Sequence, residues 1–163
     1  GMTPVVFRYF NAAGASARFG EDHREETHLI PNVLQVALGK RASVEIFGMD
    51  YETPDGSAVR DYVHVCDLAE IHRRAVERDV EGAFNLGTGR GYSVLEVIET
   101  CRRVTGHEIP VARGQRRTGD PPVLVASSAK AASILDWAPA ADLEEMVRSA
   151  WAWHKAHPEG YGD

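Results

Sequence analysis

The sequence is poor in cysteine, and this scarcity argues against a disulfide-bonded scaffold. Only two cysteines occur in 163 residues, Cys66 and Cys101, and they lie far apart among apolar neighbours. Free cysteines of this kind behave as small apolar side chains, whereas disulfides belong to oxidising compartments. We therefore expect two buried, reduced thiols in a cytoplasmic protein.

Long apolar runs and long basic runs are also missing. No stretch approaches the roughly 20 apolar residues that a membrane helix needs, and no secretory signal is recognisable. The chain has 18 Lys and Arg against 24 Asp and Glu, for a formal net charge of −6. A nucleic-acid partner is not expected, because such binding depends on clustered positive charge. A membrane partner is not expected either.

Several catalytic patterns are absent from the sequence. No Gly-x-Ser-x-Gly turn is present, and no tyrosine is followed four residues later by lysine. The seven histidines show no paired metal-ligand spacing with acids or cysteines on one helix face. We therefore expect no metal site and assign no catalytic residue.

Apolar periodicity predicts alternating strands and helices, which is typical of the α/β class with some parallel pairing. A helix is expected to start at Asp67, which has an acid three residues later, and another at Ser93, which pairs with Glu96. Gly106 would end that second helix. The expected strands are 5–10, 44–47, 62–65, 83–86, 109–112 and 123–125, and the remaining helices are 29–38, 128–135 and one from 142.

A glycine-rich turn follows the strand at 83–86 and precedes the helix at Ser93. Its glycines, Gly87, Gly89 and Gly91, could let backbone N–H groups approach a phosphate, but the spacing departs from the dinucleotide fingerprint. We weigh three interpretations: a dinucleotide loop, another ligand role and a structural turn. The structural turn is favoured.

The segment from Phe47 to Asp67 is a loop held at both ends by regular structure, and it carries Arg60 and Tyr62. A second Gly/Pro-rich loop carries Arg116, Arg117 and Asp120. Guanidinium groups bind phosphate through paired, charge-assisted hydrogen bonds. The residues therefore suggest an anion site that combines Arg60 with Arg116 or Arg117 and Asp120.

Many short stretches together resemble the UDP-glucose 4-epimerases, which are extended members of the short-chain dehydrogenase/reductase family. The similarity runs in order from Val5 to Gly160. The stretches that carry it are Arg8–Gly14, Gly20–His23, His28–Pro31, Ile46–Tyr51, Thr53–Gly56, Val59–Val65 with Asp67–Ala69, Asn85–Gly89 with Gly91–Val94, Arg116–Arg117 with Gly119–Asp120, and the closing tryptophan helix.

The resemblance implies a C-terminal half. In the family, an N-terminal Rossmann domain binds NAD and a Tyr-x-x-x-Lys pair moves the proton, and neither is present here. Residues 1–163 would form a single UDP-sugar-binding domain with fragments of the Rossmann-domain edge. We expect no NAD bound to this chain alone, and no epimerisation of UDP-glucose and UDP-galactose without the other half.

The resemblance also implies roles for individual residues. Asn11 would lie near the sugar and diphosphate, His28 and Leu29 beside the diphosphate, and Phe10 against the nicotinamide. Arg60, Arg117 and Asp120 would contact the phosphates and ribose, and Tyr62 would belong to the same substrate site. The uracil would be surrounded by Glu45, Ile46 and Phe47. Leu124 would lie near the sugar pocket, which leaves open whether N-acetylated hexoses are accepted.

A second hypothesis is a non-enzymatic, truncated module that binds itself or a partner through an exposed domain seam. The strand at 5–10 and the helix from Asp67 pack against the nucleotide-binding domain in the family, so their apolar faces would be bare here. Large bare apolar patches promote association. We therefore also expect a homo-oligomer, a dimer or larger.

Overall fold

The computed structural model describes residues 3–162, and strands and helices alternate along them as predicted. The α/β class is therefore confirmed. In chain order the elements are β1 (Val5–Tyr9), β2 (Asn11–Ala13), α1 (Leu29–Ala37), β3 (Val44–Phe47), β4 (Val59–His64), α2 (Val65–Glu77), β5 (Gly82–Leu86), β6 (Gly91–Ser93), α3 (Val94–Thr105), β7 (Val111–Gly114), β8 (Val123–Leu124), α4 (Ala129–Leu135) and α5 (Leu143–Ala156).

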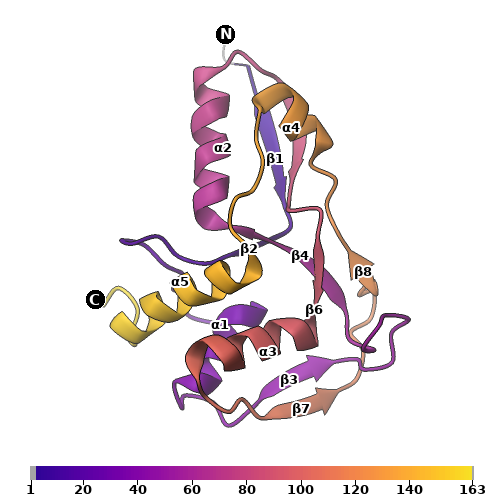
Figure 1. Ribbon diagram of the computed structural model, residues 1–163, viewed down its shortest axis with the longest axis vertical. Helices are drawn as coiled ribbons and strands as arrows, with labels where there is room; N and C mark the ends of the chain where they lie inside the picture. Colours follow the sequence, from indigo (N-terminus) through magenta and orange to yellow (C-terminus); the bar gives the residue numbers. More distant parts are fainter. Residues whose placement is uncertain (1–2, 163) are drawn as a thin grey trace.

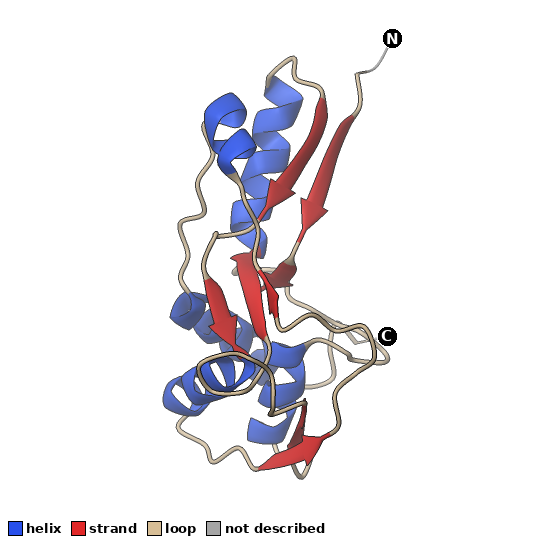
Figure 2. Ribbon diagram, turned by 90° about the vertical axis from the view of Figure 1, so that its right-hand side faces the viewer, coloured by secondary structure: helices blue, strands red, loops and turns tan. Residues whose placement is uncertain are grey.

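The strands of the described residues form three small sheets along the length of the molecule. β1 pairs with β5 in parallel at one end, and β3 pairs with β7 in parallel at the other (Figure 1). Between them β4 pairs in parallel with β2 and β8 and antiparallel with β6. Figure 2 shows that helices lie along one side of the β1–β5 sheet. The other side of that sheet has no helix over it among residues 3–162.

Two groups of buried apolar side chains hold these parts together. The larger lies among α1, α3, α5 and the neighbouring strands and includes Val33, Ile98 and Met146. The smaller lies between the β1–β5 sheet and helices α2 and α4, and includes Phe84 and Trp137. Such burial contributes about 25 cal/mol per Å2 of apolar surface, so these two groups are the main source of stability.

The ends of α3 form as the sequence predicts. The Ser93 side chain accepts a hydrogen bond from the Glu96 N–H, and the Glu96 carboxylate accepts one from the Ser93 N–H. Gly106 ends the helix in the left-handed conformation, with φ of 72°. Glycine adopts this conformation without the steric cost that a Cβ would add. Both predicted end signals are confirmed.

The predicted start of α2 at Asp67 is wrong. The helix begins at Val65, and the ring of His64 caps it by accepting a hydrogen bond from the Cys66 N–H at 3.0 Å. The Asp67 carboxylate instead accepts the N–H groups of Ala140 and Ala141, at 3.1 and 3.2 Å. The Asp67 side chain, which the local pattern predicted to cap α2, thus binds a distant segment of the chain instead.

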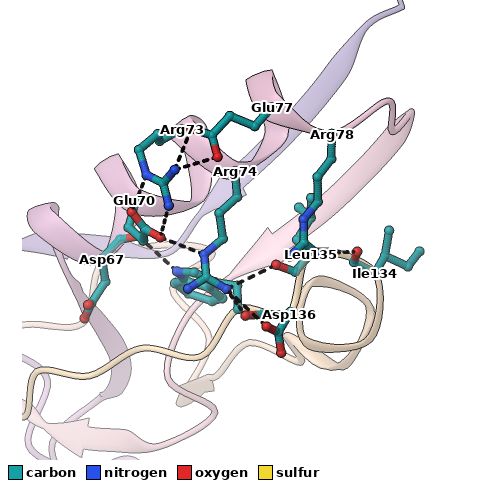
Figure 3. Close-up of polar contacts among 10 residues, drawn as sticks. Asp67, Glu70, Arg73, Arg74, Glu77, Arg78, Ile134, Leu135 and Asp136 are labelled. Carbon is teal, nitrogen blue, oxygen red and sulfur yellow. Dashed lines mark hydrogen bonds and ion pairs between the residues drawn. The ribbon is translucent and has the colours of Figure 1, made fainter.

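Two arginines, Arg74 near the end of α2 and Arg78 just after it, contact the end of α4 (Figure 3). Arg74 donates to Leu135 O at 3.3 Å and Arg78 donates to Ile134 O at 3.2 Å. The Glu70 carboxylate accepts from Arg74 at 2.7 Å and so orients its guanidinium. The last carbonyls of a helix have no partner within the helix, so these arginines satisfy groups that would otherwise need water.

The two cysteines differ in exposure, so the expectation of two buried thiols is right for one residue only. Cys101 is 0% exposed in the larger core, whereas Cys66 in the first turn of α2 is exposed. Burial raises the pKa of the Cys101 thiol to about 12. Since the thiolate is the reactive form, Cys101 is shielded twice, by the packing around it and by its pKa.

We expect a thiol reagent such as DTNB to modify one cysteine in the native protein and both in urea. Cys66→Ser should abolish the native reaction, whereas Cys101→Ala should retain it. Mass spectrometry of the modified chain identifies the site. Rapid labelling of Cys101 under native conditions would contradict the burial described above.

Within residues 3–162, the helices lack the combination of length and apolar character that crossing a membrane requires.

Candidate functional site

A cavity of about 430 Å3 opens where β2, β3, β4 and the start of α1 meet the loop that precedes β8. Its volume lies within the range of small-molecule sites in proteins. The residues that line it are Asn11, Ala12, Glu26, Thr27, His28, Leu29, Ile30, Pro31, Asn32, Arg41, Ser43, Val44, Glu45, Ile46, Phe47, Ala58, Arg60, Tyr62, Val94, Arg117 and Asp120.

The substrate residues predicted from the sequence meet at this cavity, with one exception. Leu124 lies in β8 opposite Arg60, is 45% exposed and is not among the residues that line the cavity. Phe10, predicted to contact the nicotinamide, lies at the bend between β1 and β2 and is also outside the lining. The predicted residues that line the cavity are Asn11, His28, Leu29, Glu45, Ile46, Phe47, Arg60, Tyr62, Arg117 and Asp120.

Arg60 is held rigidly at the cavity wall. Its Nη1 donates to Val59 O at 2.8 Å and Pro121 O at 2.9 Å, and its Nη2 donates to Asp120 Oδ1 at 2.8 Å. The side chain is only 13% exposed. A guanidinium carries five N–H donors, so these three bonds fix its plane and leave two donors for a ligand.

The structure distinguishes the two arginines that the sequence left as alternatives. Arg117 lines the cavity with its guanidinium 4.0 Å from the ring centroid of Phe47. Arg116 instead donates to the Asp50 carboxylate at 2.7 Å and lies over the ring of Tyr51, outside the lining. The cavity therefore combines Arg60 and Arg117, with a planar aromatic side chain beside the second arginine.

Helix α1 begins at the cavity. His28 occupies its N-cap position without a side-chain capping bond, and Leu29, Ile30 and Pro31 of the first turn line the wall. The first turn contains no acidic residue. The N–H groups of a first turn lack partners within the helix and carry partial positive charge, so this end of α1 favours an anion.

Buried apolar groups form the floor of the cavity. Ile46 is 1% exposed and Tyr62 is 4% exposed. Burial raises the pKa of the Tyr62 hydroxyl. Tyr62 therefore remains neutral and contributes a planar, uncharged surface at any ordinary pH. A cavity lined by both polar donors and apolar surface suits a ligand that has both an anionic and a planar part.

The glycine turn after β5 is closed by Asp61, which is 0% exposed. Asp61 Oδ1 accepts the Thr88 N–H at 2.8 Å, and Oδ2 accepts the Gly89 N–H at 2.9 Å and the Ala126 N–H at 3.1 Å. A Cβ added to Gly87 would lie 2.6 Å from Asp61 Oδ2. The turn amides thus bind a carboxylate of the same chain, as the structural interpretation predicts, and not an external phosphate.

Some residues near the cavity were missed by the sequence analysis. Arg41 lines it and its Nε donates to Gln35 Oε1 at 2.6 Å, but its local sequence gives no signal beyond a surface arginine. The expectation of no metal site also overlooked a cluster in the loop before α1. Its members are Glu21, His23, Glu26 and His28, whose potential ligand atoms lie within 4.8 Å of one another.

The fold and the cavity define an α/β chain with an arginine-lined cavity at the start of a helix. Residues 1–87 match the model of the NAD dependent epimerase/dehydratase family, which is more than half of the 163 residues. The chain belongs to this family.

The individual proteins that this chain resembles belong to one kind of enzyme within the family. The chain is 58% identical over 168 residues to a UDP-glucose 4-epimerase of Halalkalibacterium halodurans, covering 99% of this chain and 50% of that protein. A crystal structure of a UDP-glucose 4-epimerase superposes with a TM-score of 0.94 at 48% identity, over 99% of this chain and 51% of that one. That of the Bifidobacterium longum enzyme, in complex with NAD+ and UDP, gives 0.92 at 42% identity, over 98% and 49%. The chain thus spans about half the length of these relatives.

Proposed function

We propose that this chain is the UDP-sugar-binding C-terminal half of a UDP-glucose 4-epimerase-like protein. Its ligands would be UDP-glucose and UDP-galactose, bound in the cavity between α1 and β4. The observation that carries the proposal is the meeting of Asn11, Arg60 and Arg117 at one cavity, although they are far apart in the sequence.

The chemistry of the cavity supports a nucleoside diphosphate sugar. Arg60 and Arg117, with the first turn of α1, would bind the diphosphate, and Phe47 with Ile46 would contact the flat uracil. Asp120, whose charge is engaged by Arg60, would orient the guanidinium and the ribose. Asn11 would face the sugar.

Catalysis would require groups outside this chain. No tyrosine is followed four residues later by lysine in the sequence, so the proton-transfer pair of the family is not supplied here. NAD would be bound by the other half of the family's architecture, with Phe10 of this chain against the nicotinamide. The chain alone is therefore proposed to be inactive in interconverting UDP-glucose and UDP-galactose, and to function in the cytoplasm.

Thermal unfolding with added UDP tests the binding proposal. A ligand that binds only the folded state at 100 times its Kd stabilises it by about 2.7 kcal/mol, which raises Tm by roughly 5 °C or more for a chain of this size. Uridine is the matched control, because it retains the base and ribose but lacks the diphosphate. An equal shift with uridine, or no shift with millimolar UDP, would contradict the proposal.

Self-association is a second candidate, and the outer surface of the β1–β5 sheet favours it. Val6 is 52% exposed on β1, which pairs with only β5 among the described strands. An unpaired strand edge with apolar side chains offers hydrogen-bonding groups and apolar contact to a second chain.

We expect the purified chain to form a dimer or larger assembly through this surface. Light scattering after size-exclusion chromatography measures the mass, and Val6→Lys should reduce it towards that of one chain. Ile134→Lys is the control, since Ile134 is 44% exposed but lies on α4, which is not part of the expected association surface. A wild-type monomer at high micromolar concentration would remove this candidate.

A further inference from the structure

The loop between β2 and α1 brings two imidazoles and two carboxylates together at the edge of the cavity: Glu26 and His28 line the cavity, whereas Glu21 and His23 do not. The loop is held before the cluster by the C-terminal segment: the Tyr161 hydroxyl contacts both the N–H and the carbonyl of Gly20, at 3.0 and 2.9 Å. After the cluster the chain enters α1 at Leu29. The backbone that carries the four side chains is therefore fixed at both ends.

The four side chains converge on a small volume. His28 Nδ1 lies 2.5 Å from Glu21 Oε1 and 2.9 Å from Glu26 Oε1, and His23 Nδ1 lies 3.8 Å from Glu21 Oε1. The ring centroids of His23 and His28 are 5.1 Å apart. Bonds of about 2.0–2.1 Å to a tetrahedral ion place neighbouring ligand atoms roughly 3.3 Å apart. The three nitrogen–oxygen distances, 2.5, 2.9 and 3.8 Å, lie on both sides of this value.

The two carboxylates of the cluster are largely buried, so their negative charges are poorly solvated and favour a nearby positive charge. The side chain of Glu26 is 4% exposed and that of Glu21 is 22% exposed, whereas both imidazoles are about half exposed. The Glu26 carboxylate also accepts the His28 N–H at 2.6 Å, which aims it into the cluster. Two carboxylates with little solvent around them meet at one imidazole nitrogen, and positive charge at that point would offset their repulsion.

The donor types indicate which cation fits. Two imidazole nitrogens and two carboxylate oxygens are ligands typical of Zn2+ and neighbouring transition-metal ions, whereas Mg2+ and Ca2+ prefer oxygen alone. The exposed imidazoles leave a path for the ion to enter. We propose that Glu21, His23, Glu26 and His28 form a binding site for a divalent transition-metal ion of the zinc class.

Calorimetric titration of Zn2+ into tag-free, chelator-treated protein tests this site without nucleotide. We expect saturable binding of one ion per chain that excess Mg2+ does not displace. Co2+ should bind at the same site and give the visible absorption of a low-coordinate complex. Each ligand variant should weaken Zn2+ binding at least about tenfold, because even the outer partners of metal ligands contribute that much.

His23→Ala and Glu21→Gln are the informative variants, because neither residue lines the nucleotide cavity. His107→Ala is the matched control, since His107 is exposed and distant from the loop in sequence. Absence of saturable Zn2+ binding, or equal affinity in His23→Ala and wild type, would overturn the metal site. UDP binding by His23→Ala should match that of the wild type, so failure of the metal site leaves the proposed function testable.

Discussion

Arg60→Ala is expected to weaken UDP binding by about 10- to 150-fold. A hydrogen bond to a charged group contributes about 1.5–3 kcal/mol, and each 1.4 kcal/mol corresponds to a factor of ten in Kd. Arg60 is 13% exposed and three hydrogen bonds hold its plane, so little side-chain entropy remains to be lost when a ligand binds. Calorimetric titration with UDP measures the change.

Arg60 also holds the loop before β8 through Pro121 O and Asp120, so Arg60→Ala could weaken UDP binding by disturbing that loop. A control must therefore distinguish the loss of a ligand contact from a change in the loop. Arg60→Lys keeps the positive charge but loses the planar fork, so it should bind UDP more weakly than wild type and more strongly than Arg60→Ala. Arg148→Ala is the matched surface control, since Arg148 forms ion pairs with the exposed carboxylates of its own helix and does not line the cavity. UDP affinity within twofold of wild type in a folded Arg60→Ala protein would rule out the proposed diphosphate contact.

Local patterns predicted the secondary structure well where the determining contacts are close in sequence. The capping pair of Ser93 and Glu96 spans three residues, and Gly106 ends α3 through its own backbone. Asp67 carries the same type of signal, yet its carboxylate binds amides more than 70 residues away. A local pattern cannot reveal that competing partner, which is why the predicted start of α2 is wrong.

Most of the residues predicted for the site line the cavity, but their geometry could not be predicted from the sequence. The resemblance to a known family identified Arg60 and Arg117, whereas composition alone could not distinguish Arg117 from Arg116. Only the fold shows that one guanidinium lies over Phe47 at the cavity and the other pairs with Asp50. The cluster of Glu21, His23, Glu26 and His28 was missed because it lies in an irregular loop. Metal ligands on a helix face have a regular spacing in the sequence, whereas ligands in such a loop do not.

Asp61→Ala is expected to lower the free energy of unfolding by roughly 3–5 kcal/mol, because it leaves several buried donors without an acceptor. The carboxylate is 0% exposed and accepts the N–H groups of Thr88, Gly89 and Ala126. Urea denaturation followed by circular dichroism measures the loss. Asp79→Ala is the matched control, because Asp79 is exposed and should change stability by less than about 0.5 kcal/mol.

Asp61→Asn keeps the shape of the side chain and makes the prediction testable if the alanine variant does not fold. An amide retains one acceptor oxygen, but its NH2 group would face N–H donors, so we expect an intermediate loss of stability. The bond from Ala126 to Asp61 anchors the chain just after β8, and the loop before β8 carries Arg117 and Asp120. The folded Asn variant should therefore also bind UDP more weakly than wild type. Wild-type stability in Asp61→Asn would show that the buried charge is not what holds the glycine turn to β8.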